Sequence, residues 1–225
     1  MTAFHGWFVT GTDTEIGKTF ATCVLIHAAQ AQGFTALGMK PVAAGATEVG
    51  GRLLNEDAAR LLEAGSFDPG AELLNPFCLR TPVAPHIAAA AENVRLDPTR
   101  IATAFDALRQ RCDRLFVEGA GGFLSPLGEG FDAASLARAL DIPIILVVGM
   151  KLGCINHALL TAEAIATRNL KLAGWIANCL SADMPHQESN IATLRRRLGA
   201  PLLGTLPYAP EADPRTLAHW VTLPT

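Results

Sequence analysis

The residues whose types and spacing most clearly indicate chemistry lie in segment 11–19. This segment reads GTDTEIGKT and comes just after the apolar run 7–9. A strand, a glycine-bounded loop and a helix start direct unpaired backbone N–H groups to one point, where the helix dipole also favours an anion. Lys18 adds a mobile positive charge for the outer phosphates of a nucleotide, and the Thr19 hydroxyl can ligate a bridging Mg²⁺. The usual pattern has glycine where this chain has Thr12, so the loop is a variant. A tight turn without a ligand is the alternative, but it does not require Lys-Thr.

Charged residues also follow two other apolar runs. Lys40 follows the run 35–39, and Glu118 follows the run 114–117 and precedes a glycine-rich stretch. Because ligands bind beyond the carboxyl ends of parallel strands, we expect both side chains at the edge that carries the phosphate loop. An apolar run normally excludes an unpaired charge, so Glu118 is a candidate Mg²⁺ ligand; a capping carboxylate is the alternative. Asp57 can complete the metal shell, although alone it would indicate only a helix-start charge.

A further strand end carries glycine, lysine and a helix start, because residues 148–157 read VGMKLGCINH. This pattern predicts a second anion site near Lys151. Cys154 and His157 could form a nucleophile and base, but no third partner is visible, so packing is the favoured reading. Asn178 ends another apolar run, and its amide can both donate to and accept from an adenine edge; an isolated turn asparagine is the alternative.

Composition limits the possible functions. The 225 residues carry a formal net charge of -3 and five scattered cysteines without paired metal-ligand spacing. The length fits one α/β domain over residues 1–225, which would bury about 70 to 75% of its unfolded surface. The charge provides no basic field for nucleic acid or a membrane, and the run 195–197 is expected at a solvated helix end. The cysteines suit a reducing cytoplasm, and no apolar stretch approaches the ~18 residues of a membrane span or forms an export signal.

The charged groups require an alternation of strands and helices to position them. We expect strands at 6–10, 35–39, 114–118, 143–148, 172–177 and 202–206, and helices at 18–31, 55–64, 98–112, 132–140, 153–168 and 187–198. This order predicts a mostly parallel central sheet flanked by helices. Asp97 and Pro98 are expected to begin a helix, and Gly65 and Gly199 to follow helix ends.

Five blocks of the chain resemble dethiobiotin synthetase: residues 9–19, 39–42, 117–122, 147–157 and 174–178. They occur in the order of that family and span nearly the whole chain. The Lys-Leu-Gly-Cys-Ile-Asn-His block is far more specific than the phosphate loop, which many ATPases share. The resemblance implies a three-layer P-loop NTPase-like α/β fold and a homodimeric, Mg²⁺-dependent, cytoplasmic enzyme of biotin synthesis. Its substrates would be ATP, 7,8-diaminononanoate and carbon dioxide, and its products dethiobiotin, ADP and phosphate.

The resemblance also implies a role for each matching residue. Lys40 and Lys18 would be catalytic, and Thr19, Asp57 and Glu118 would hold the metal. ATP would contact Thr14, Glu15, Ile16, Gly17, Lys18, Thr19, Phe20, Asp57, Glu118, Gly119, Ala120, Gly121, Asn178, Cys179, Pro207, Tyr208 and Ala209. The substrate would contact Thr14, Lys40, Ala44, Lys151, Gly153, Cys154, Ile155 and Asn156. Its carboxylate would sit on the helix start at residues 153–156 of the neighbouring subunit.

The chain departs from the family pattern at Ala44, where a hydroxyl residue is common, at Cys179, where an acidic residue is common, and over residues 181–190. Two other functions share the expected core. An amide-forming ligase of the cobyrinic acid amidase type usually needs a glutamine-hydrolysing domain, for which this chain has no room. A positioning switch like the partition and septum-site ATPases typically carries an extra lysine early in the loop, where this chain has residues 12–16. The tail 213–225 also forms no basic amphipathic helix.

Overall fold

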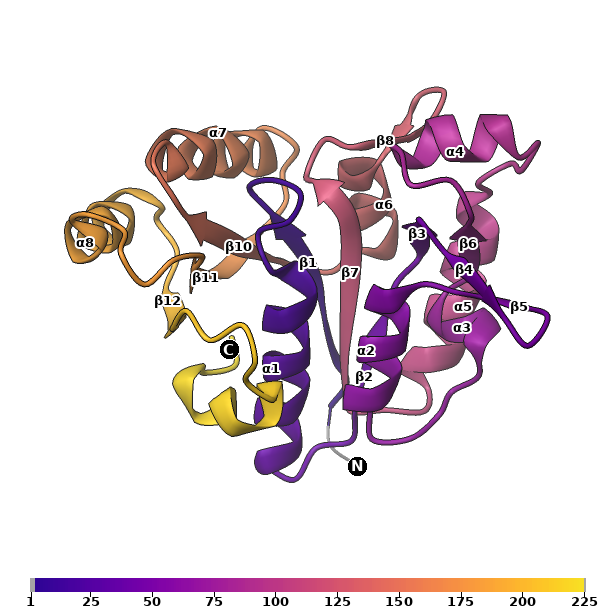
Figure 1. The fold of residues 1–225 in the computed structure, drawn as a ribbon, viewed down its shortest axis with the longest axis horizontal. Coiled ribbons are helices and arrows are strands. Elements are labelled where there is room, and N and C mark those ends of the chain that lie inside the picture. Colours follow the sequence, from indigo (N-terminus) through magenta and orange to yellow (C-terminus); the bar gives the residue numbers. More distant parts are fainter. Residues whose placement is uncertain (1–2, 225) are drawn as a thin grey trace.

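A computed structural model describes residues 3–224. Its centre is a six-stranded sheet in the order β12-β11-β10-β1-β7-β2 (Figure 1), and every neighbouring pair is parallel. The strands are β1 (His5–Gly11), β2 (Ala36–Met39), β7 (Arg114–Gly122), β10 (Ile144–Met150), β11 (Leu172–Cys179) and β12 (Leu202–Leu206). All six predicted strands and the parallel sheet are therefore confirmed.

The predicted helices are also present. They are α1 (Lys18–Ala31), α2 (Glu56–Ala64), α5 (Pro98–Arg109), α6 (Ala133–Leu140), α7 (Cys154–Ala166) and α8 (Gln187–Arg197). The Asp97 side chain caps α5 by accepting from the Thr99 N–H, and Gly65 is the C-cap of α2. Such caps satisfy backbone groups that the helix itself leaves unpaired. No helix within residues 3–224 has the length and apolar character needed to cross a membrane.

Helices cover both faces of the sheet, as the three-layer prediction requires (Figure 1). Side chains of successive strand residues point to opposite faces, so Trp7 and Val9 pack with α1, whereas Phe8 packs with α5 and α6. Leu146 and Val148 of β10 pack with α7 and α8. Because both faces of β10 are covered, its sequence is continuously apolar rather than alternating.

The sequence did not predict the short elements. These are β3 (Val42–Ala44), β4 (Thr47–Val49), β5 (Arg52–Leu54), α3 (Ala71–Leu74), β6 (Phe77–Leu79), α4 (Pro85–Ala91), β8 (Pro126–Gly128), β9 (Phe131–Asp132) and the 3-10 helix η1 (Pro214–Trp220). Most span two to four residues, which is too short for a periodic hydrophobic pattern. The parallel pair β3–β6 matters for the site, because it fixes the chain that follows Lys40.

Candidate site for a nucleotide and phosphoryl transfer

The loop between β1 and α1 depends on the glycine at position 17. Gly17 has φ 79°, in the left-handed region, and a Cβ there would lie 2.2 Å from Nδ2 of Asn178. That amide donates to the Ile16 carbonyl at 2.8 Å, which ties the loop to the end of β11. Among the described residues no side chain caps α1, so the first backbone N–H groups of this helix are available to an anion.

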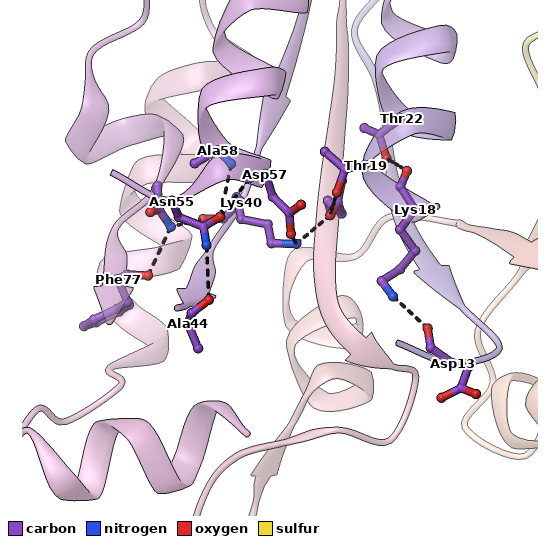
Figure 2. Close-up of polar contacts among 12 residues, drawn as sticks. Asp13, Lys18, Thr19, Thr22, Lys40, Ala44, Asn55, Asp57, Ala58 and Phe77 are labelled. Atoms are coloured by element: carbon purple, nitrogen blue, oxygen red, sulfur yellow. Dashed lines mark hydrogen bonds and ion pairs between the residues drawn. The ribbon is translucent and has the colours of Figure 1, made fainter. Parts of the chain in front are cut away.

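Asp13 joins the two lysines of this loop region. Lys18 donates its Nζ proton to the Asp13 carbonyl at 2.8 Å (Figure 2), and Lys151 Nζ lies 2.8 Å from Asp13 Oδ2. The hydrogen bond from Lys151, then that from the Thr14 N–H, lowers the pKa of the Asp13 carboxyl. Lys151, which the sequence predicts to contact an anion, thus pairs here with a carboxylate of the phosphate loop. The sequence assigned no role to Asp13.

The predicted metal ligands and Lys40 meet in one cluster, which is buried except for Asp57. Lys40 Nζ lies 2.5 Å from Glu118 Oε1 and 2.8 Å from Asp57 Oδ2, and the Thr19 hydroxyl donates to Glu118 Oε1 at 2.8 Å. These four residues come from α1, the end of β2, α2 and β7, and Lys40 and Asp57 point toward one another in Figure 2. Lys40 is 3% exposed and Glu118 0%.

Charge pairing controls the ionisation of this cluster. Burial disfavours a charged ammonium, but the Glu118 and Asp57 carboxylates outweigh it and raise the pKa of Lys40. Burial likewise opposes the Asp57 carboxylate, but Lys40 lowers its pKa overall. Lys40 is therefore a cation at neutral pH, held by two carboxylates at the strand edge.

The donor atoms of the cluster fit Mg²⁺. Glu118 Oε2 is buried and has no hydrogen-bond partner within residues 3–224. A buried carboxylate oxygen without a partner is costly, and a cation removes that cost. Together with the Thr19 hydroxyl and the half-exposed Asp57 carboxylate it forms an all-oxygen set, which Mg²⁺ prefers.

Two asparagines that the sequence reading missed hold this cluster in place. Asn55 accepts from the Asp57 and Ala58 N–H groups at 3.0 and 3.3 Å, and it donates to the Ala44 carbonyl at 3.1 Å (Figure 2). Asn75 donates to the Lys40 carbonyl at 2.6 Å. Asn before Glu-Asp is an N-cap pattern, so Asn55 could have been identified. No local pattern distinguishes Asn75, because its partner is 35 residues away.

Asn178, which is predicted to contact adenine, and residues 207–209, which are predicted to contact ATP, share a cavity of about 200 Å³. Its lining consists of Phe20, Arg60, Asn178, Cys179, Leu180, Pro207, Tyr208, Ala209 and Pro210. Gly119, Ala120 and Gly121 lie on β7, whose Gly122 is in register with Gly11 of β1, and so they flank the phosphate loop. A Cβ on Gly121 would lie 3.6 Å from the Thr14 hydroxyl.

The predicted substrate-carboxylate site lies at the start of α7. Gly153 has φ 92° at the N-terminus of α7, and no described side chain caps this helix. Residues 153–156 form no hydrogen bond with the Lys40 cluster in the part of the chain that the structure describes. Cys154 is 1% exposed and packs in the core under α7 and α8, which supports the packing role over a nucleophile.

Comparisons with known proteins show the family of the chain. The family described as AAA domain matches residues 5–216. The ATP-dependent dethiobiotin synthetase BioD of Aromatoleum aromaticum is 59% identical over 100% of both chains, and that of a Janthinobacterium strain is 48% identical over 98% of this chain and 95% of its own. The MinD cell division protein of Aquifex aeolicus shares the fold, with a TM-score of 0.58 and 15% identity over 92% of this chain and 84% of its own. The chain thus belongs to the dethiobiotin synthetase family.

Proposed function

We propose that this chain catalyses the ATP- and Mg²⁺-dependent carboxylation and ring closure of 7,8-diaminononanoate, with carbon dioxide as the carbon source. Dethiobiotin, ADP and phosphate would be the products. The observation that carries the proposal is the convergence of Thr19, Lys40, Asp57 and Glu118 beside a phosphate loop in a chain 59% identical to a dethiobiotin synthetase. We further propose that residues 1–225 act as one domain in the cytoplasm.

The chemistry needs no protein nucleophile. One amine captures carbon dioxide as a carbamate, and a carbamate oxygen attacks the terminal phosphorus of ATP, so that ADP leaves. The second amine then attacks the carbonyl carbon of the mixed anhydride, releases phosphate and closes the five-membered urea. The enzyme must therefore orient the reactants and stabilise negative charge on the migrating phosphoryl group.

Each site residue has a part in that task. The uncapped start of α1 and Lys18 would bind the phosphates, while Asn178 and residues 207–209 would hold adenine. Lys40 would donate to the phosphoryl oxygens as charge develops, which contributes about 3 kcal/mol for a donor of this type. Mg²⁺ bound by Thr19, Asp57 and Glu118 would neutralise phosphate charge. Thr14 and Ala44 would contact the diamine.

The protonation of Lys18 gives a pH test of the phosphate-loop assignment. Burial, then the charge of Lys40, lowers the pKa of Lys18 from 10.5 to about 8. Bound phosphates favour the charged form and raise this pKa again, so ATP binding at pH 8.5 should take up roughly 0.5 to 0.8 proton. Affinity should fall as pH rises above 8. Calorimetry in buffers of different ionisation enthalpy measures the uptake, and Lys18→Met should abolish it. Binding without proton uptake in the wild type would contradict the assignment.

We also propose that the enzyme is a homodimer in which residues 153–156 of one subunit bind the substrate carboxylate in the site of the other. The uncapped start of α7 supports this, as do Leu152 and Leu160, which are 98% and 57% exposed.

Leu152→Glu is therefore expected to dissociate the dimer and to lower activity about tenfold or more, because a charge would enter an apolar interface. Sedimentation velocity and activity across a dilution series measure both effects. Val49→Glu, at a position 59% exposed on the β4–β5 hairpin, is the matched control. A fully active monomer would exclude the shared site.

The reaction itself is tested by incubating the protein with ATP, Mg²⁺, diaminononanoate and ¹³C-bicarbonate. We expect the cyclic urea to carry one ¹³C and to form in equal amount to ADP. ATP hydrolysis without the urea would favour an ATPase switch of the kind suggested by the shared MinD fold. A linear amide product would favour another amide-forming ligase.

A further inference from the structure

Arg60 lies at the junction of two cavities. It shares the cavity of about 200 Å³ with Asn178 and residues 207–209. A second cavity of about 470 Å³ is lined by α1, α2 and the segment that follows β12. Figure 1 shows α1 between the other two elements. The lining of this second cavity includes Phe20, Cys23 and His27 of α1, Arg60 and Glu63 of α2, and residues 210–215. We call it the α1 groove. Arg60 thus stands where the expected base site opens into this groove.

The guanidinium of Arg60 is held only weakly. It pairs with Glu56 at 2.5 Å, one turn earlier on α2, and the two side chains are 57% and 77% exposed. Exposed pairs of this kind add little stability, so the side chain can reorient at small cost. A planar guanidinium stacks well on flat π-systems, which distinguishes it from a lysine ammonium.

The lining of the smaller cavity indicates which part of a nucleotide Arg60 meets. Its other members supply an amide, the aromatic rings of Phe20 and Tyr208, and a proline-rich turn. Among the described residues that line this cavity, none belongs to residues 15–19 of the phosphate loop. Arg60 therefore lines the cavity expected for the base.

We propose that the Arg60 guanidinium stacks on the base of the bound nucleotide and closes the base site toward the α1 groove. This inference rests on the proposed use of ATP. Arg60 is then a direct contact of the co-substrate and increases its affinity, with no part in phosphoryl transfer.

The test compares binding of ATP, ADP and inorganic tripolyphosphate, each with Mg²⁺, to the wild type and to Arg60→Ala. Calorimetry should show ATP and ADP weakened by the same factor, about five- to tenfold, and tripolyphosphate unchanged. In steady state the KM for ATP should rise by that factor while kcat stays constant. Equal weakening of tripolyphosphate would place Arg60 on the phosphates, and unchanged binding of all three would remove it from the site; either result overturns the proposal.

Two further variants separate stacking from other effects. Glu56→Gln breaks the same ion pair but keeps the guanidinium, so it should bind ATP as the wild type does. If it binds as weakly as Arg60→Ala, the loss comes from α2 and not from stacking. Arg60→Lys keeps the charge but not the plane, and full rescue by it would contradict stacking. Failure of the wild type to bind ATP at all would instead refute the proposed function.

Discussion

Lys40→Met is expected to lower kcat about 100- to 1000-fold while the Kd for ATP changes less than about threefold. The loop and Lys18 that bind the phosphates are untouched, whereas the ammonium needed as charge develops on the phosphoryl group is lost. Stopped-flow turnover and calorimetry with ATP measure the two quantities. Lys171→Met is the matched control. Lys171 is exposed and lies just before β11, at the amino-terminal ends of the strands, whereas Lys40 lies at the carboxyl ends.

Lys40→Met should also lower the free energy of unfolding. Measuring this free energy separates an effect on folding from an effect on catalysis. Without Lys40, the carboxylates of Asp57 and Glu118 lose the cation between them, which costs about 3 to 5 kcal/mol of unfolding free energy. Mg²⁺ should recover part of that loss by binding the same oxygens. A Lys40→Met protein that folds, binds ATP and turns over at the wild-type rate would remove Lys40 from catalysis.

Glu118→Gln is expected to lower activity by about 100-fold or more and to raise the Mg²⁺ concentration for half-maximal activity at least about tenfold. The amide lacks the negative charge of the carboxylate, and Glu118 Oε2 is the buried oxygen without a partner in the described chain. Lys40 also loses its nearer counter-ion. A Mg²⁺ titration of activity, with Mg²⁺ binding to the nucleotide complex measured by calorimetry, follows both changes.

The exposed Glu129→Gln should behave as the wild type in that titration. If Glu118→Gln retained the wild-type dependence on Mg²⁺, the carboxylate would not be a metal ligand. The cluster would then be an ion-pair network that positions Lys40 alone.

The sequence predicted the main sheet because its strands and helices are long. The run at β10 is apolar over its whole length and rich in β-branched residues, which favours a strand covered on both faces over a buried helix. The start of α1 is indicated by Gly17 before it and Lys18 at its first position. The edge elements from β3 to α4 were missed because they are too short to show a period. Their structure depends on contacts such as Asn75 with the Lys40 carbonyl, which no local pattern encodes.

The sequence predicted the individual residues of the site better than the contacts between them. Thr19, Lys40, Asp57 and Glu118 were each identifiable from their position after a strand or at a helix start. That Lys40 bridges the two carboxylates, and that Lys151 reaches Asp13 across 138 residues of chain, are consequences of tertiary packing. Arg60 was missed for a similar reason. Its spacing on a helix indicates only an ion pair with Glu56, and only the folded chain brings it to the cavity that Asn178 also lines.

The central claim is that the carbamate oxygen attacks the terminal phosphorus of ATP at this cluster. The most direct measurement supplies C¹⁸O₂ with ATP, Mg²⁺ and diaminononanoate and analyses the released phosphate by mass, within the first turnovers and before the label exchanges with water. The account predicts one ¹⁸O in each phosphate, because the oxygen that attacks phosphorus leaves with it when the ring closes. Unlabelled phosphate, formed together with the cyclic urea, would contradict it.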